Sequence, residues 1–472
     1  MRSMVPSRAR GHVLVALGGL LLSGRPVVAL AGPEIRLGAY TLQPGIASAL
    51  EYHTNAYLAD GLINEVQPAL SLHLRPQLQL LRDTEQDIVS VRGAWNLRKF
   101  IDIEPDDAFV TGNLDRFRDM DVDVSADLRK AWRVGLRLDD HFEVISSPAQ
   151  LETAAADTDA NVRLTSNDAR ATLVVRPGSA LEIGLVGNLG LDRFDVPALL
   201  TSDGNPNLNN RTSYGPVLDA RWRFLPRTAV VSKVALHWLD WENNLVNAVG
   251  PDVAAEGNPY GNYIGKPDAT KWHASAGLRG QVTDGLAVVA EFGFGQMEYD
   301  ETTVLGAAGA AQSGEIAASG AESFARDLTT FGEGFTTNLL VRYGFARVGD
   351  KPRHVVGLGY KKDFQDAFFT NYVAYNNVFA NYTANLGQAL TVDTEGSFRL
   401  DAYHGEVTRT DLVVRMRGGV TWRPRPDSPL AFSASAGWNE RACADVECED
   451  GGFYGVQYDD FYSSLGVSFN NR

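Results

Sequence analysis

Long apolar runs are missing from this sequence of 472 residues. Its longest clean apolar run covers residues 13–22, whereas a membrane-spanning helix requires about 18 or more apolar residues. A polytopic α-helical transporter is therefore excluded. Apolar residues still make up 44% of the chain and charged residues only 21%, so the composition is not that of a disordered protein.

Positive charge is also scarce. The formal net charge is −15, and the first 31 residues contribute four arginines and no acidic residue. The remainder therefore carries a charge of about −19, whereas nucleic-acid binding requires a basic patch. Nucleic acid is not expected as a partner.

Cysteine occurs only twice, as Cys443 and Cys448 in the acidic segment 441–450. In an exported chain two nearby cysteines are expected to form a disulfide. A metal site is the alternative, but two thiols without a nearby histidine do not complete a tetrahedral site. We expect no metal and no cofactor.

The usual catalytic motifs are absent from the mature sequence, which has no G-x-S-x-G elbow, H-E-x-x-H pair or P-loop lysine motif. His237, His273 and His404 lie on or near predicted strands, where a structural role is the more common one. We predict that the protein is not an enzyme. A hydrolase embedded in a barrel, with a reactive serine, is kept as a third hypothesis.

The N-terminus has the features of a secretory signal. A basic stretch is followed by the apolar run, by Ser23-Gly24 and Pro26, and by Ala29-Leu30-Ala31 before Gly32. We predict a signal peptide over residues 1–31, which leaves 32–472 as the mature chain. A short membrane anchor or a buried helix is the alternative.

Alternation with a period of two residues runs along nearly the whole mature chain and predicts β-strands. In segment 119–129, for example, Met120, Val122 and Val124 share one face, while Asp121 and Asp123 share the other. The predicted strands are 37–53, 65–80, 87–99, 118–132, 133–146, 166–176, 180–193, 212–224, 228–242, 271–282, 285–299, 335–347, 352–366, 369–384, 388–402, 409–423, 429–441 and 456–469.

The connections between these strands alternate in length. Tight joins such as 176–179 and 282–285 are separated by long polar connections such as 243–270 and 300–334. All eight tryptophans fall near predicted strand ends, and most share the apolar face. Short turns on one side, long loops on the other and two aromatic bands are typical of outer-membrane barrels. We therefore predict an all-β, transmembrane, antiparallel up-and-down barrel of about 16–18 strands, with 18 as the best count.

The start of the mature chain resembles the first strand of a β-barrel porin family of Gram-negative outer-membrane proteins. The resemblance lies in segments 35–44 (IRLGAYTLQP) and 45–56, and segments 174–181 and 224–229 look like that family's periplasmic turns. It implies a channel in the outer membrane of a Gram-negative bacterium, without naming the solute.

Two departures from the family pattern stand out. Residues 51–55 read Glu-Tyr-His-Thr-Asn where an acidic pair before Asn is expected, so a cation-binding role is not carried over to them. The aromatic residue that usually closes the last strand is Phe469, three residues before the end.

On the predicted barrel, the polar faces point into the lumen and supply candidate pore-lining residues. These are Arg92, Arg98, Asp121, Asp123, Asp127, Arg137, Arg170, Glu182, Asp219, Arg221, Arg223, Arg279, Glu291, Arg342, Asp393, Glu395, Arg399, Arg415 and Arg417. The arginines could guide carboxylated or phosphorylated sugars. The simpler interpretation is that acids and arginines pair to rigidify the wall, and this is the interpretation that we favour.

We predict a channel that passes polar solutes or exported polysaccharide across the outer membrane. The alternative is a non-conducting outer-membrane or secreted β-protein whose long loops bind a surface partner. Expected partners are outer-membrane lipids, lipopolysaccharide, the barrel assembly machinery and polysaccharide-export components. Segment 302–334 is expected to be either a pore-constricting loop or a surface loop, and segment 445–450 either a cation site or a solvated acidic tip.

Overall fold

The computed structural model describes residues 35–54, 68–101, 119–145, 163–195, 210–241, 268–299, 303–305, 325–327, 332–348, 351–366, 372–404, 409–425, 428–443 and 458–469. Within these ranges no helix is long and apolar enough to cross a membrane. The predicted signal peptide lies outside the described residues.

The described chain is built from β-strands. They are β1 (Ile35–Leu37), β2 (Tyr40–His53), β3 (Ala69–Asp83), β4 (Ile88–Phe100), β5 (Asp119–Leu128), β6 (Val134–Ile145), β7 (Arg163–Val175), β8 (Leu181–Asp195), β9 (Arg211–Leu225), β10 (Thr228–Trp241), β11 (Ala269–Gln281), β12 (Leu286–Tyr299), β13 (Thr303–Leu305), β14 (Ala325–Asp327), β15 (Gly332–Val348), β16 (Lys351–Asp366), β17 (Tyr372–Leu386), β18 (Leu390–His404), β19 (Arg409–Trp422), β20 (Leu430–Cys443) and β21 (Tyr458–Phe469). Eighteen of them coincide with the eighteen predicted strands. The three-residue strands β1, β13 and β14 are too short to give a sequence pattern.

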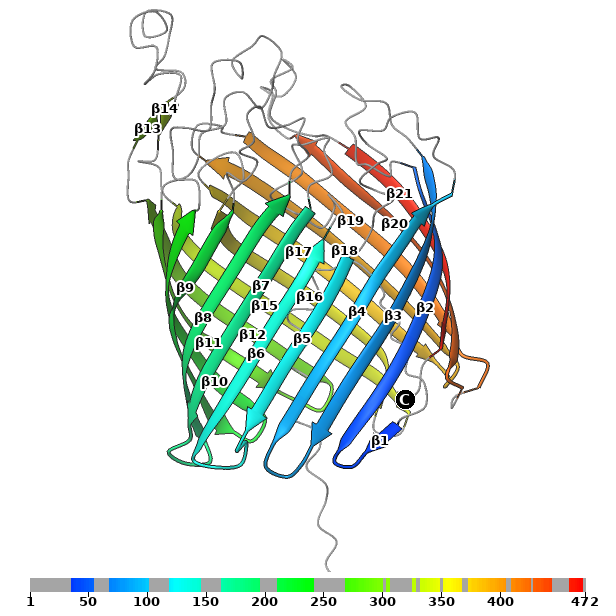
Figure 1. Cartoon of the computed structure of the whole chain (residues 1–472), viewed down its shortest axis with the longest axis horizontal. Helices are drawn as coiled ribbons and strands as arrows, with labels where there is room; N and C mark the ends of the chain where they lie inside the picture. The colour runs from blue at the N-terminus through cyan, green and yellow to red at the C-terminus, as the bar shows by residue number, and fades with distance from the viewer. Residues whose placement is uncertain are drawn as a thin grey trace, which may run out of the picture.

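Pairing of the first and last long strands closes the sheet into a barrel. β2 pairs with β21 in antiparallel register, from Ile46 opposite Phe469 to His53 opposite Tyr462. In Figure 1 the blue β2 and the red β21 lie side by side. The predicted antiparallel barrel of eighteen strands is thereby confirmed. β1 adds a short pairing along β2, and β13 and β14 form a separate two-stranded sheet.

Short turns join the strands at one end of the barrel, which we call the turn end. The opposite end, where the longer connections leave the strands, is the loop end. Between β17 and β18 the turn needs only residues 387–389, and Gly387 adopts a φ of 75°. Glycine enters this left-handed region without a Cβ clash, so the chain can reverse tightly.

Apolar side chains form a belt around the outside of the barrel. Leu185 of β8 and Leu218 of β9 are cross-strand partners, and they are 55% and 50% exposed. Gly184 and Asp219, the neighbouring pair, belong to the opposite face. Such a continuous apolar surface is unsuited to water. Closure also pairs the backbone N–H and C=O groups of the wall strands within the sheet, as a hydrocarbon environment requires. The outer surface is therefore that of a transmembrane β-barrel.

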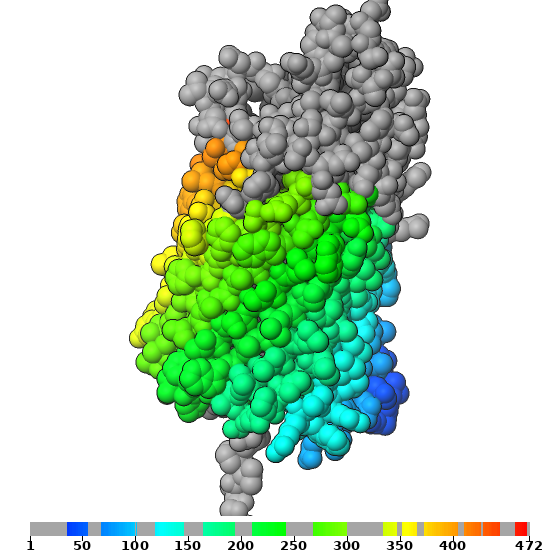
Figure 2. Space-filling view, turned by 90° about the vertical axis from the view of Figure 1, so that its left-hand side faces the viewer, coloured from blue at the N-terminus to red at the C-terminus, as the bar shows by residue number. Residues whose placement is uncertain are grey.

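Six tryptophans mark the two rims of this belt. Trp132, Trp222 and Trp422 are exposed at the turn end, and Trp95, Trp238 and Trp272 at the loop end. Trp438 lies in the outer row of β20 and is half-buried, whereas Trp241 lies in the inner row of β10 and is only 3% exposed. Figure 2 shows the side of the barrel formed by the green strands as an unbroken wall.

Asp140 departs from the outer apolar pattern. It lies in the outer row of β6, between Val124 of β5 and Ala169 of β7, midway along the strand. An acidic residue at this depth costs less than an arginine or lysine, so an isolated acid here is compatible with a lipid-facing wall.

A charge placed at the middle of the belt tests the membrane-facing assignment. Leu218→Arg should lower the free energy of unfolding by about 2–4 kcal/mol, because a guanidinium would face hydrocarbon. Leu181→Arg, at the turn end of the adjacent strand β8, should cost only about 0–1 kcal/mol. Denaturant unfolding in lipid vesicles measures both, and equal costs would contradict the assignment.

Candidate functional site

The inner wall of the barrel carries the charged side chains and is the candidate functional site. All nineteen predicted pore-lining residues lie in the rows that alternate with the outer apolar rows; Arg92, for example, follows the exposed Val91 of β4. Their placement on the inner face agrees with the sequence pattern. Their role as pore-lining residues stays a prediction.

Ion pairs connect neighbouring strands over much of this wall. Asp121 of β5 lies 2.6 Å from Arg75 of β3 and 3.8 Å from Arg92 of β4. Further pairs among the predicted residues are Arg137–Asp127 (3.6 Å), Arg279–Glu291 (2.6 Å) and Arg417–Glu395 (3.7 Å). The partly exposed pairs each contribute little to stability, about 0–1 kcal/mol, but together they restrain the wall side chains.

Three predicted arginines stand apart from this lattice. Arg221, Arg223 and Arg342 form no ion pair or side-chain hydrogen bond within the described part of the chain. Arg98 and Arg415 do have interaction partners. The favoured interpretation, in which arginines and acids pair, therefore fits several of the predicted residues, whereas these three form no ion pair within the described residues and only Arg221 has an acid, Glu182, opposite it in register.

A second network, at the loop end, is buried. Arg441 of β20 donates to the Asp411 carboxylate of β19 at 2.5 Å and to the Tyr403 hydroxyl of β18 at 2.7 Å. Asp411 is fully buried and Arg441 nearly so. Arg399 pairs with Asp401 at 2.5 Å on the same wall. Breaking a buried pair of this kind leaves an uncompensated charge, so the network fixes the positions of β18 to β20.

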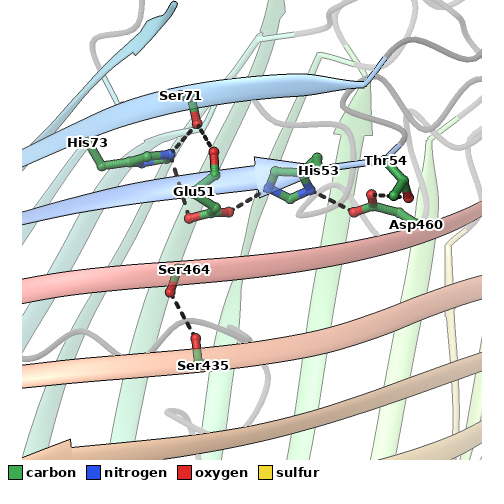
Figure 3. A network of polar contacts seen from close by, with 8 residues as sticks. All are labelled: Glu51, His53, Thr54, Ser71, His73, Ser435, Asp460 and Ser464. Atoms are coloured by element: carbon green, nitrogen blue, oxygen red, sulfur yellow. Dashed lines mark hydrogen bonds and ion pairs between the residues drawn. The ribbon is translucent and has the colours of Figure 1, made fainter.

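A third network spans the seam between β2 and β21 (Figure 3). His53 bridges two carboxylates, with Nδ1 2.7 Å from Asp460 Oδ2 and Nε2 2.6 Å from Glu51 Oε1. Its ring stacks on Tyr462, with 5.6 Å between ring centroids. Asp460 is 1% exposed and also accepts a hydrogen bond from Thr54. At the loop end, these contacts hold the first and last long strands of the sheet, β2 and β21, together.

Ser71 and His73 extend this network and bear on the hydrolase hypothesis. The Ser71 hydroxyl lies 2.9 Å from His73 Nε2, and Glu51 approaches the same nitrogen at 3.6 Å. In a catalytic triad the serine and the acid occupy opposite ring nitrogens. Ser71 is also only 1% exposed. This geometry ties β2 to β3 and does not present a nucleophile.

At the loop end β16 separates from β15 and turns into the barrel mouth together with the end of β17, which stays paired with β18 as far as Tyr372 opposite His404. Pairing of β15 with β16 stops at Thr337 opposite Lys362, whereas β16 and β17 stay paired up to Asp366 opposite Tyr372. We call residues 363–366 and 372–375 the folded-in hairpin end.

Apolar packing holds the folded-in hairpin end. Phe364 belongs to the same alternating row as the exposed Leu358, so on the wall it would face outward. Instead it is 4% exposed and packs in one cluster with Tyr372 and with inner residues of β10 to β12. Those residues are Leu239, Trp241, Ala269, Met297 and Tyr299. The Lys271 ammonium donates to the Phe364 carbonyl oxygen at 3.3 Å.

Sequence reasoning missed several residues of the inner wall. Lys233, Arg353 and Arg441 lie in inner rows, and their alternation with apolar neighbours could have identified them. No sequence pattern indicates that Phe364 turns inward. Trp241 lies near a long loop, as predicted for all eight tryptophans, but faces inward because it is in the row of β10 that alternates with the outward-facing row, and there it packs in the cluster with Phe364.

Two other predictions concern the loops. Cys443 at the end of β20 is disulfide-bonded. Cys448 lies outside the described residues, so the expected pairing stays a prediction. Segment 445–450 and most of segment 302–334 also lie outside them. Among the described residues, no group of three or more His, Cys, Asp or Glu side chains is arranged to hold a metal ion.

No family model and no curated protein matches the sequence. Among solved structures, the chain is similar to the FrpB iron transporter from Neisseria meningitidis (F3-3 variant), with 7% identity, a TM-score of 0.44, and coverage of 90% of this chain and 81% of that one. It is also similar to the outer membrane protein opdK from Pseudomonas aeruginosa, with 11% identity, a TM-score of 0.42 and coverage of 91% and 98%. The corresponding values for the outer membrane channel DcaP of Acinetobacter baumannii are 9%, 0.38, 93% and 99%. At these identities and scores the likeness carries no argument about function. The barrel that the family resemblance implies is confirmed by the strand register.

Removing one member of the seam network tests its structural role. Asp460→Ala should lower the free energy of unfolding by about 1–3 kcal/mol, because His53 and Thr54 lose their buried acceptor. Asp459→Ala is the matched control, since Asp459 is an exposed neighbour. The unfolding temperature on semi-native gels measures both variants. An effect of equal size for the two would show that the seam does not depend on this network.

Proposed function

We propose that the protein is a porin-like channel of the Gram-negative outer membrane. One observation carries the proposal: a closed eighteen-stranded barrel has an apolar outer belt and a charged inner wall. Barrels of about 16–18 strands are too wide for side chains to fill, which favours an aqueous lumen.

The exposure of the inner charges supports this reading. The side chains of Arg170, Arg279 and Glu395 are 57%, 43% and 43% exposed, although all three lie in inner rows. Ionised groups need either hydration or an ion-pair partner. A water-filled lumen would hydrate these side chains. The cargo of such a channel is a polar solute or an exported polysaccharide, and the proposal assigns transport and no catalytic step.

Surrounding lipid, lipopolysaccharide and the assembly machinery are the partners that follow from this location. Phe461, Leu465, Val467 and Phe469 form an outward apolar stripe on the last strand, with 42–66% exposure. This stripe offers the assembly machinery an apolar terminal strand, although the last aromatic residue, Phe469, lies three residues before the end of the sequence. Components of polysaccharide export would join only if the cargo is a polysaccharide.

Current through single molecules tests the channel proposal. The refolded mature protein in a planar bilayer should produce stable, steadily open current steps in salt solution, because water and ions fill the lumen. Heat-modifiable migration on a gel provides the control for folding. Silence from folded, inserted protein would contradict an open channel and favour a loop-binding surface protein or an export channel that opens only with partners.

Releasing the folded-in hairpin end should enlarge the pore. The double variant Phe364→Ala/Tyr372→Ala removes two buried aromatic rings, and each large-to-small change of this kind costs about 3–5 kcal/mol of packing. We expect a larger unit conductance than in the wild type. Phe398→Ala, an exposed outer-face phenylalanine of β18, is the control and should leave the conductance unchanged. Equal conductance in the double variant and the wild type would mean that the hairpin end does not narrow the pore.

A further inference from the structure

Five arginines gather on one side of the inner wall, in the turn-end halves of four strands. We call this group the arginine arc; it consists of Arg221 and Arg223 of β9, Arg279 of β11, Arg342 of β15 and Arg353 of β16. The like charges of Arg223 and Arg279 act on the Arg221 guanidinium, alongside the opposite charge of Glu182 on β8. Like charges are thus held close together along this side of the barrel.

Few acids neutralise the arc. The inner rows of these strand halves and of the intervening β10 and β12 contain two acids, Asp219 and Glu291, and a third, Glu182 of the neighbouring β8, lies opposite Arg221 in register and pairs with Arg176 at 3.0 Å. Glu291 is engaged by Arg279, at 2.6 and 3.1 Å. Asp219 lies opposite Lys233 in register, and this lysine adds another positive charge. The other four members of the arc form no ion pair within the described residues.

Small neighbours leave the guanidinium groups open to the lumen. Arg342 lies between Ala287 of β12 and Gly357 of β16, and Ala229 of β10 lies beside Arg279. Arg223, Arg342 and Arg353 are exposed. A structural arginine would instead be expected to lie against an acid or an aromatic ring, as Arg399 does against Asp401 and Tyr375.

The other walls differ in their charge balance. On β5 and β6 the acids Asp123 and Asp127 have His141 and Arg137 within 4 Å, and on β18 Glu395 has Arg417. Among the strand residues that the structure describes, inner-row arginines without an ion pair are therefore concentrated on the arc. Unneutralised like charges destabilise a folded wall, so their concentration on one lumen face points to a ligand that neutralises them.

We infer that the arginine arc is a binding and selectivity site for anionic solutes that carry carboxylate or phosphate groups. Guanidinium groups bind both anions through paired N–H donors, and a row of them lets the anion move from one to the next. The inference rests on the proposed channel function and adds the solute class to it.

The reversal potential under a salt gradient tests the arc. Wild-type channels should be anion-selective, and the triple variant Arg221→Gln/Arg223→Gln/Arg342→Gln should lower the chloride-to-potassium permeability ratio by at least about threefold, because the wall loses its field. The matched control is Arg129→Gln/Lys130→Gln/Arg227→Gln, which removes three positive charges from turns at the same end. Arg342→Gln alone should shift the ratio in the same direction if the triple variant does not insert.

Three added solutes identify the chemistry. Tripolyphosphate and trigalacturonate supply phosphate and carboxylate groups, and neutral maltotriose is the control. We expect at least one of the two anions to reduce the wild-type current at concentrations that leave the triple variant open. Block by only one of them identifies the preferred group. Unchanged selectivity in the triple variant, or no block by either anion, would overturn the inference while the channel proposal stands.

If the folded protein conducts no current, calorimetry tests the arginine arc separately from the channel proposal. That result would overturn the open channel, and the arc would then be tested by titrating tripolyphosphate and trigalacturonate into the detergent-solubilised full chain. Binding that is weakened about tenfold or more by the triple variant, a difference of about 1.4 kcal/mol, would support the arc. No binding of either anion to the wild type would overturn it.

Discussion

Backbone hydrogen bonding in lipid is the constraint on which the rest of this structure depends. A strand in hydrocarbon has no water to satisfy its N–H and C=O groups, so both of its edges need a neighbouring strand. The pairing of β2 with β21 meets that requirement at the seam. The seam also carries a dense polar network, in which His53 bridges Glu51 and Asp460. Because the two strands come from opposite ends of the chain, closure depends on contacts between residues about 400 positions apart.

Closure then separates the two faces of every strand. The outer face has to match lipid and is dominated by apolar and aromatic side chains, with polar exceptions such as Asp140, Asn167 and Ser48. The inner face is free of that restriction and can carry charge. Many of its charges pair with each other, and among the described strand residues the inner arginines without an ion pair gather on one side. The same alternation that makes the barrel stable in a membrane therefore makes its interior available for polar cargo.

Eighteen strands and their faces could be predicted because the period-two pattern repeats independently in each strand. Tight turns such as 387–389 set the boundaries, and inner residues such as Arg342 follow from the alternation alone. The pattern does not say which inner residues approach each other, since this depends on register and on barrel curvature. Arg75 meets Asp121 across an intervening strand, which no local rule predicts. The inward turn of Phe364 depends on an apolar cluster assembled from five strands and was equally invisible in the sequence.

The central claim is that a lipid-facing outer wall encloses a water-filled lumen. Single cysteines introduced along β9, in a Cys443→Ser/Cys448→Ser background, test it most directly. In folded protein in vesicles, a water-soluble thiol reagent should label positions 219 and 221 and leave 218 and 220 unmodified. Labelling that alternates with period two at the middle of the strand is the result that this account predicts. Protection of both rows, or labelling of both, would contradict a water-filled barrel in lipid.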